Sequence, residues 1–148
     1  MATPLEAFLL SCKSVSSGFE KSFIFLTLNK NKMRDFKRLI VWQKGFQLFI
    51  DSHKFCRKLP PEEKYELASQ LRRAAFSIPA NIAEGSAKAT NAHKKLFLEN
   101  SLGSSYEVET ALLSIIELYP VFKPDCEQSL NICIEVQKML TALINKLT

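Results

Sequence analysis

Acidic side chains are the first candidates for catalysis, because general acid–base chemistry commonly uses positioned carboxylates. Glu107 and Glu109 are two residues apart. Side chains two apart on a helix point about 200° away from each other, so this pair cannot act together on one substrate. Nothing around Glu84, which precedes Gly85, indicates an acid–base role. The carboxylates therefore predict no catalytic site.

The cysteines and histidines also lack the pattern of a metal or redox site. The cysteines form no CxxC pair and fit no zinc motif with His53 or His93; they are Cys12, Cys56, Cys126 and Cys133. Cys126 and Cys133 are seven apart, which places both on one side of a helix, where small apolar side chains usually serve packing. No Gly-rich phosphate loop or nucleophile elbow is present. We predict a non-enzymatic, cytoplasmic protein with buried thiols, no metal and no cofactor.

Basic side chains leave nucleic-acid binding open as a function. The formal net charge is +5, and the longest basic runs are pairs such as Arg72-Arg73 and Lys94-Lys95. A mild excess of this kind favours an acidic partner, but it is also common on proteins that bind none. The candidate nucleic-acid contacts are Arg72, Arg73, Lys88, Lys94 and Lys95.

Length and composition predict one helical domain preceded by an extension. The chain has 148 residues, of which 47% are hydrophobic, with only four glycines; this suffices for one compact core and favours helices over hairpins. Residues 1–32 lack a sustained period, and their apolar run is too short for a secretory signal or a membrane span. We expect the domain to cover residues 33–148, and our hypothesis is that Met33 is the true start.

The first predicted helix carries two apolar stripes. Its predicted core stripe is Leu39, Trp42, Phe46, Phe49, His53 and Cys56, and a second stripe is Val41, Leu48 and Phe55. Trp42 is interpreted as a packing anchor because it repeats with Leu39 and Phe46. Two stripes indicate two packing partners.

The second predicted helix starts near Glu62, after Pro60 and Pro61. Its core stripe is Leu67, Leu71, Ala74, Ala75, Ile78 and Ile82. Pro79 removes one intrahelical bond, so we expect a kink there. Gly85 is predicted to end the helix in a left-handed conformation. We interpret Asn81 and Gln70 as polar contacts within or between subunits, with Asn81 also able to satisfy backbone groups freed by Pro79.

The third and fourth helices complete the predicted fold. The third starts near Thr90 or Asn91 and runs to about Tyr119, and Gly103 in its middle indicates close backbone approach. One of its apolar stripes contains Leu98, Leu102, Glu109, Leu113 and Ile116, and the other Phe97, Ser101, Ser104, Val108, Leu112, Ile115 and Tyr119. The fourth begins after Pro124 and Asp125, and its apolar seam is Ser129, Cys133, Val136, Leu140, Leu143 and Leu147. Short connections then predict an all-α, antiparallel up-down-up-down four-helix bundle whose second helix is kinked.

Three segments carry a resemblance to a known family. They are VWQK at 41–44, YELASQLRRAAFSIPANIAEG at 65–85 and GSSYEVET at 103–110. Together they resemble the 23S rRNA intervening-sequence family of bacterial four-helix bundle proteins, over residues 33 to about 147. The sequence departs from the family in its 32-residue extension and in Ala87-Lys88, where the family often carries an arginine.

The resemblance implies a mode of assembly more firmly than a biochemical activity. It implies a ring-shaped homo-oligomer, commonly a pentamer, and kinship with the accessory variability determinant of diversity-generating retroelements. That relative binds nucleic acid and a reverse transcriptase, so RNA, DNA and a reverse transcriptase are expected partners by kinship. No biochemical activity is established for the family itself.

Arg72 and Arg73 lie within the motif and have two interpretations. One of them reaches a phosphate or lines a positive ring interior, or else it pairs with Glu107 or Glu109, because a carboxylate on an apolar stripe needs a partner. We favour the pairing. The other motif residues, Gln70, Ile78, Pro79, Asn81, Glu84, Gly85 and Gly103, are assigned structural roles.

Two functional hypotheses remain open, and both need an oligomer. The first is a ring that binds RNA or DNA through a basic surface, and the second is a protein-interaction scaffold with no nucleic-acid affinity. The second apolar stripes support self-association, because a lone bundle would leave them facing water.

Overall fold

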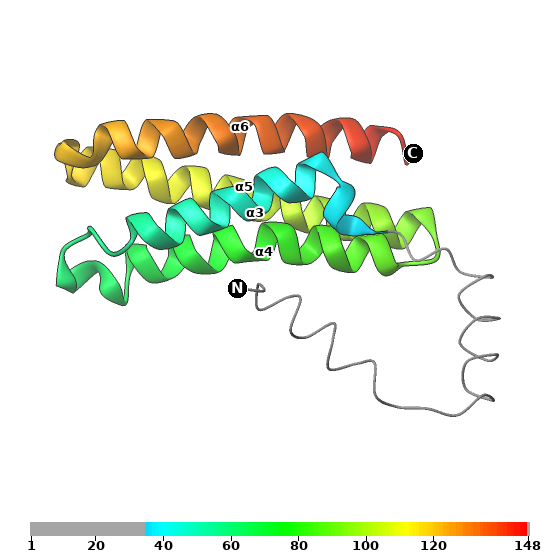
Figure 1. Ribbon diagram of the computed structural model, residues 1–148, viewed down its shortest axis with the longest axis horizontal. Helices are drawn as coiled ribbons and strands as arrows, with labels where there is room; N and C mark the ends of the chain where they lie inside the picture. Colours follow the sequence, from blue (N-terminus) through cyan, green and yellow to red (C-terminus); the bar gives the residue numbers. More distant parts are fainter. Residues whose placement is uncertain (1–34, 148) are drawn as a thin grey trace, which may run out of the picture. The chain divides into compact units, whose positions relative to one another are not determined.

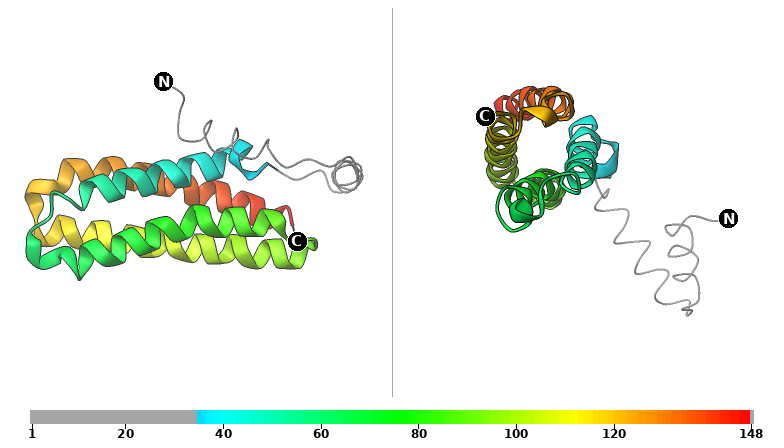
Figure 2. Two further views of the ribbon diagram at one scale, coloured as in Figure 1. Left: turned by 60° about the horizontal axis from the view of Figure 1, so that its bottom comes forward. Right: turned by 90° about the vertical axis from the view of Figure 1, so that its left-hand side faces the viewer.

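The computed structural model describes residues 35–147, which form four antiparallel helices and no strand (Figure 1). The helices are α3 (Ile40–Phe55), α4 (Leu67–Ala87), α5 (Asn91–Leu118) and α6 (Lys123–Asn145). Viewed along the bundle, consecutive helices occupy neighbouring corners and α6 returns beside α3 (Figure 2). The predicted all-α four-helix bundle is confirmed. The predictions for residues 1–32 and Cys12 lie outside the described residues.

Short 3-10 turns and prolines set the helix ends. The turns are η1 (Phe36–Arg38), η2 (Pro61–Lys64) and η3 (Pro120–Phe122). Proline opens η2 and η3, where its missing N–H costs nothing. Thr90 caps α5, because its hydroxyl accepts a hydrogen bond from the amide of His93 at 3.3 Å. The predicted start of α5 is therefore correct, whereas α4 begins at Leu67 rather than near Glu62.

Pro79 lies within α4, which continues through it to Ala87. Proline has no N–H for the carbonyl of Ala75, so the predicted bend is consistent with this position. Asn81 donates to the carbonyl of Ser77 at 2.8 Å and to its hydroxyl at 2.9 Å. The amide thus makes a contact within the subunit, as predicted, but not with the carbonyl that Pro79 frees. Ile78 and Pro79 are both buried.

The core face of α3 differs from the prediction. Val41, Leu48 and Phe55 are buried, together with Gly45 and Ser52. The residues predicted as the core stripe flank this face instead: Phe46 is 43% and Leu39 39% exposed, while Trp42 and Phe49 are half-buried and His53 is exposed. Of that stripe only Cys56 is buried. The assignment was wrong because two apolar stripes on one helix look alike until the partner helices choose between them.

The second apolar stripe of α5 is buried as well, although it was expected to face water in a lone bundle. Val108, Leu112 and Ile115 of that stripe are fully buried, whereas Leu113 of the other stripe is 48% exposed. On α6 the predicted seam is confirmed at its buried members, while Leu143 and Leu147 are half-buried and Cys126 is buried on the same side as Cys133; the buried members are Ser129, Cys133, Val136 and Leu140. Among the described helices, none is long and apolar enough to span a membrane.

Candidate interaction surface

A strip of aromatic side chains runs along the face that α3 shares with α4. The aromatic strip consists of Phe36, Trp42, Phe46, Phe49 and Phe76. The rings of Trp42 and Phe46 stack with their centroids 5.1 Å apart, and Phe49 meets Phe76 edge-on at 5.5 Å. Phe76 is 58% exposed. The strip is therefore ordered by its own ring contacts while much of it faces solvent.

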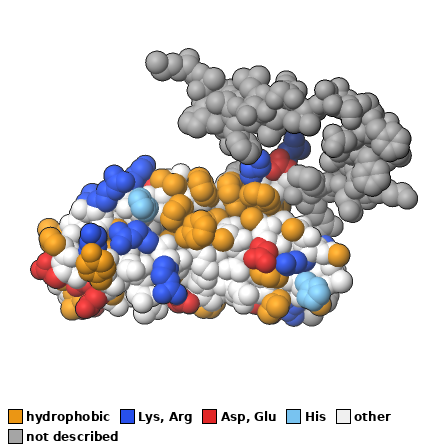
Figure 3. Space-filling model, turned by 90° about the horizontal axis from the view of Figure 1, so that it is seen from below, with side chains coloured by type: hydrophobic (Ala, Val, Ile, Leu, Met, Phe, Trp, Pro, Cys, Tyr) orange, Lys and Arg blue, Asp and Glu red, His pale blue; other side chains and the backbone are white. Residues whose placement is uncertain are grey.

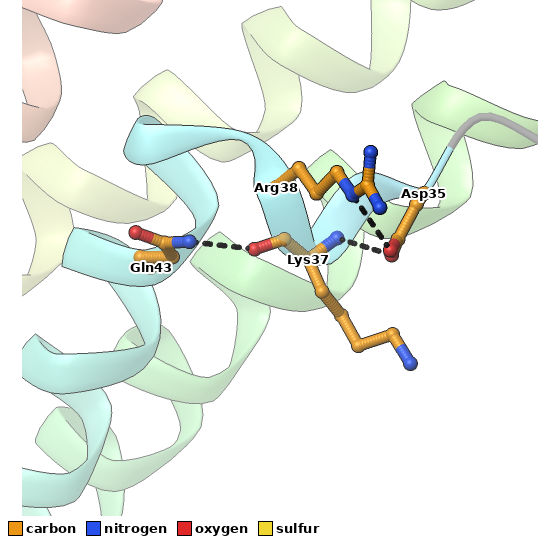
Figure 4. Close-up of polar contacts among 4 residues, drawn as sticks. All are labelled: Asp35, Lys37, Arg38 and Gln43. Carbon is orange, nitrogen blue, oxygen red and sulfur yellow. Dashed lines mark hydrogen bonds and ion pairs between the residues drawn. The ribbon is translucent and has the colours of Figure 1, made fainter.

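The local sequence explains how the strip forms. Trp42, Phe46 and Phe49 recur every three to four residues, so they share one flank of α3. The turn η1 brings Phe36 against Trp42, with ring centroids 5.2 Å apart. Asp35 accepts a hydrogen bond from the amide of Lys37 at 3.2 Å (Figure 4).

A second set of polar contacts closes η1. Arg38 lies 3.5 Å from the other oxygen of Asp35, and Gln43 of α3 donates to the carbonyl of Lys37 at 2.8 Å (Figure 4). These contacts tie the turn to the first turn of α3. The end of the aromatic strip at Phe36 is thus held by hydrogen bonds.

Basic side chains lie beside the other end of the strip. Figure 3 shows a band of hydrophobic side chains on this face, with Lys, Arg and His gathered beside it. His53 follows Phe49 on α3 with ring centroids 6.1 Å apart, and Arg57 comes one turn later. Arg73 precedes Phe76 by one turn of α4 and is exposed. Aromatic rings next to cations can bind either an apolar partner or nucleic-acid bases and phosphates.

Buried serine side chains connect the neighbouring pair of helices, α4 and α5. Ser104 donates a hydrogen bond to Ser77 at 2.9 Å, and Ser101 donates to the carbonyl of Ile78 at 3.0 Å. A shallow groove of about 400 Å³ lies along this pair of helices. We call it the α4–α5 groove; its lining residues are Leu67, Gln70, Gly103, Tyr106, Glu107, Thr110, Ala111 and Ser114.

The predicted pairing of Arg72 or Arg73 with Glu107 or Glu109 is wrong. Arg72 instead donates to the carbonyl of Lys64 at 3.1 Å, and Glu109 accepts from Gln137 of α6 at 2.7 Å. Glu107 and Arg73 are both exposed, so neither carboxylate nor guanidinium needs a buried counter-charge. The stripe that carries Glu109 turns toward α6, which is why the amide of Gln137 is within its reach.

The candidate nucleic-acid contacts separate into two groups. Because α4 rises about 1.5 Å per residue, Arg72 and Lys88 lie roughly 24 Å apart along its axis. Lys88 pairs with Glu84 at 3.1 Å and covers the ring of Phe97 at 4.4 Å. Lys95 lies 4.0 Å from Glu99, and Lys94 lines a cavity of about 200 Å³ at that end of the bundle. Within one chain the five cations form no single phosphate site.

The glycines differ from their predicted roles. Gly85 is not a left-handed terminator, since no glycine in the described residues has a positive φ; it is buried in α4, where a Cβ would lie 3.0 Å from that of Phe97. Gly103 has no heavy atom within 4 Å of an added Cβ, so the expected close approach does not occur within the chain. Close approach occurs at Gly45, where a Cβ would lie 2.9 Å from Ile78. The sequence signal for it was a lone glycine on the buried stripe between Val41 and Leu48.

The described cysteines are free and buried, as predicted. Burial, with the carboxylate of Glu109 nearby, raises the pKa of the Cys133 thiol to about 12. Burial also raises the pKa of Cys126 to about 11. Thiols of this kind are poor nucleophiles at neutral pH. Among the described residues, no group of three or more His, Cys, Asp or Glu side chains is arranged to hold a metal ion.

One known protein family matches most of this sequence. A family described as 23S rRNA-intervening sequence protein matches residues 37–142, which is well over half of the chain. The chain belongs to this family. The matched region contains α3, α4 and α5 entirely and nearly all of α6. No curated protein matches the sequence at a significant level.

Proposed function

We propose that this member of the 23S rRNA-intervening sequence protein family is a non-enzymatic, ring-forming homo-oligomer that binds RNA or DNA through a basic surface. The observation that carries the proposal is the aromatic strip. Phe46 and Phe76 expose 43% and 58% of their surfaces, and they adjoin half-buried Trp42 and Phe49 in one continuous patch. Contiguous apolar patches are uncommon on monomeric proteins and usually mark interfaces.

Self-association would also bring the separated cations together. One chain offers Arg73 and Arg57 beside the strip and a distant lysine group at the α4–α5 turn. In a ring every copy contributes the same cations, so the oligomer offers several times as many phosphate contacts as one chain. Each additional phosphate contact makes the affinity for nucleic acid fall more steeply with salt concentration. The pentamer is the expected ring size by family resemblance. Free thiols at Cys56, Cys126 and Cys133 support a reducing, cytoplasmic location.

The deciding experiment is light scattering coupled to size exclusion on the full chain, with and without a short single-stranded RNA. We expect one defined oligomer whose mass rises with RNA at about 50 mM salt and much less at about 200 mM. Arg73→Ala should weaken RNA binding with the oligomer intact, whereas the matched control Lys138→Ala on α6 should not. A monomeric protein would overturn the proposal.

The alternative function is a protein-interaction scaffold with no nucleic-acid affinity. It is favoured by the ion pairs of Lys88 with Glu84 and of Lys95 with Glu99, which reduce the charge available to phosphates. An oligomer whose mass is indifferent to RNA and duplex DNA at every salt concentration would select this alternative.

A further inference from the structure

We infer that the ring is closed by a heterologous contact, in which the aromatic strip of one copy lies in the α4–α5 groove of the next. The inference rests on the proposed self-association and specifies which surfaces meet. Its first support is side-chain size: the strip consists of large rings, of which Phe76 is 58% exposed, whereas the groove has small side chains at Gly103, Ala111 and Ser114 beside the larger Leu67 and Tyr106. Large side chains on one helix pack best into hollows above small ones on another.

The glycine at position 103 supplies the second support. A glycine within a helix is less favourable than alanine, because it loses more backbone freedom on folding. At Gly45 and Gly85 the neighbouring helix explains the glycine, since an added Cβ would lie 2.9 Å from Ile78 and 3.0 Å from Phe97. Around an added Cβ at Gly103, no heavy atom of the described chain beyond the adjacent backbone of α5 lies within 4 Å. An aromatic side chain of a second copy that approaches the backbone of α5 closely would explain why position 103 carries no side chain.

Charge supplies the third support. Among the residues that line the α4–α5 groove, Glu107 is the one charged side chain. The aromatic strip ends beside His53, Arg57 and Arg73. If the strip of one copy faced the strip of another, these cations would come together, whereas a strip placed in the groove brings His53 and Arg57 toward Glu107. Complementary charges favour one register over another and disfavour the symmetric pairing.

The placement of the two surfaces explains a closed ring. The strip lies between α3 and α4 and the groove between α4 and α5. Because α4 lies between α3 and α5 in the bundle (Figure 2), the two surfaces are neighbouring faces that share α4. A heterologous contact closes a ring when its rotation closes and builds a filament when it does not, and contacts through neighbouring faces supply the turn from copy to copy that a ring requires. The shared helix α4, which carries the exposed Arg73, then lies on the inner side of the ring.

Complementation between two broken variants tests this contact. The double variant Phe46→Ser with Phe76→Ser removes the two most exposed rings of the aromatic strip, and Gly103→Trp fills the α4–α5 groove. Each variant alone should be monomeric by light scattering, with a circular-dichroism spectrum like that of the wild type. An equimolar mixture should give a dimer and nothing larger, because the intact strip of one variant fits the intact groove of the other. The matched controls on α6, Ile134→Ser and Lys138→Trp, should keep the wild-type mass.

The outcomes separate this inference from the proposed function. A monomeric wild type would overturn both. An oligomeric wild type in which Gly103→Trp still assembles would overturn the heterologous contact and leave the ring standing. Loss of assembly in both variants without a dimer on mixing would also overturn it, since a heterologous contact requires complementation. If either variant fails to fold, Gly103→Leu and Phe76→Ser alone replace them and the same mixture is measured.

Discussion

The two flanks of α3 meet their neighbours in opposite ways. Toward α6, the seam is crossed by ion pairs between Lys44 and Glu135 and between Lys58 and Asp125, the latter at 2.8 Å. Toward α4, the seam is covered by aromatic rings, and none of the ion pairs in the described residues crosses it.

The contrast indicates which of the two seams has a surface that is stable in contact with water. Half-exposed lysine and aspartate side chains keep their hydration and are stable at a solvent boundary. Exposed rings such as Phe46 gain nothing from water and gain much from a second apolar surface. The α3–α6 seam therefore has the polar surface of a solvent-exposed boundary, whereas the α3–α4 seam leaves apolar rings exposed to solvent. Four experiments test this contrast, in order of decreasing effect.

The largest effect is expected in the core stripe of α3. Leu48→Ala should lower the free energy of unfolding by about 2–5 kcal/mol, because it leaves a cavity at a fully buried position. Phe46→Ala should cost less at low protein concentration, and its cost should grow with concentration because oligomers unfold by mass action. Urea unfolding at two concentrations measures both. An equal, concentration-independent loss for Phe46→Ala would place the aromatic strip in the core.

The next largest effect is expected for alanine substitutions at Gly45 and Gly103, which should change the free energy of unfolding in opposite directions. Gly45→Ala should destabilise the bundle by about 1–3 kcal/mol, because its Cβ overlaps the Cγ2 methyl of Ile78. Gly103→Ala should stabilise the isolated chain by up to about 1 kcal/mol, because alanine is the better helix former and no neighbour obstructs it. Thermal unfolding at low concentration checks both signs. Stabilisation by Gly45→Ala would refute the close contact of α3 with α4.

A smaller effect is expected within the aromatic strip. The edge-on pair of Phe49 and Phe76 should show a coupling energy of about 0.5–1.5 kcal/mol in a double-mutant cycle to alanine. The coupling should be insensitive to salt, because it arises from ring contact. A value of zero would mean that Phe76 does not pack on α3 in solution.

The smallest effect belongs to the α3–α6 seam. The pair of Lys58 and Asp125 should couple by about 0.2–1 kcal/mol, and the coupling should fall as salt rises. Urea unfolding of Lys58→Met, Asp125→Asn and the double variant gives the value. A larger, salt-independent coupling would show that this seam is a specific contact rather than a solvated exterior.

Local signals predicted most of the fold and little of the candidate surface. Thr90 as a cap, Pro79 within a helix and the seam through Cys133 and Val136 were readable, because caps, prolines and helical periodicity act within a few residues. The core face of α3 and the partners of Arg72 and Glu109 were not. Those choices depend on which helix packs against which flank, and no local pattern distinguishes two apolar stripes on one helix.

By itself, then, the sequence determined that this chain forms helices, where most of them start, and that four of them build a bundle. Tertiary structure decided that Leu48 rather than Phe46 enters the core, that Gly45 rather than Gly103 is pressed against a neighbouring helix, and that Arg73 is left unpaired on the surface. The physical reason is the separation along the chain over which each interaction acts. Hydrogen bonding and capping are settled within a helical turn, whereas burial is settled only when four helices compete for one interior, and the other apolar flank of α3 stays partly exposed.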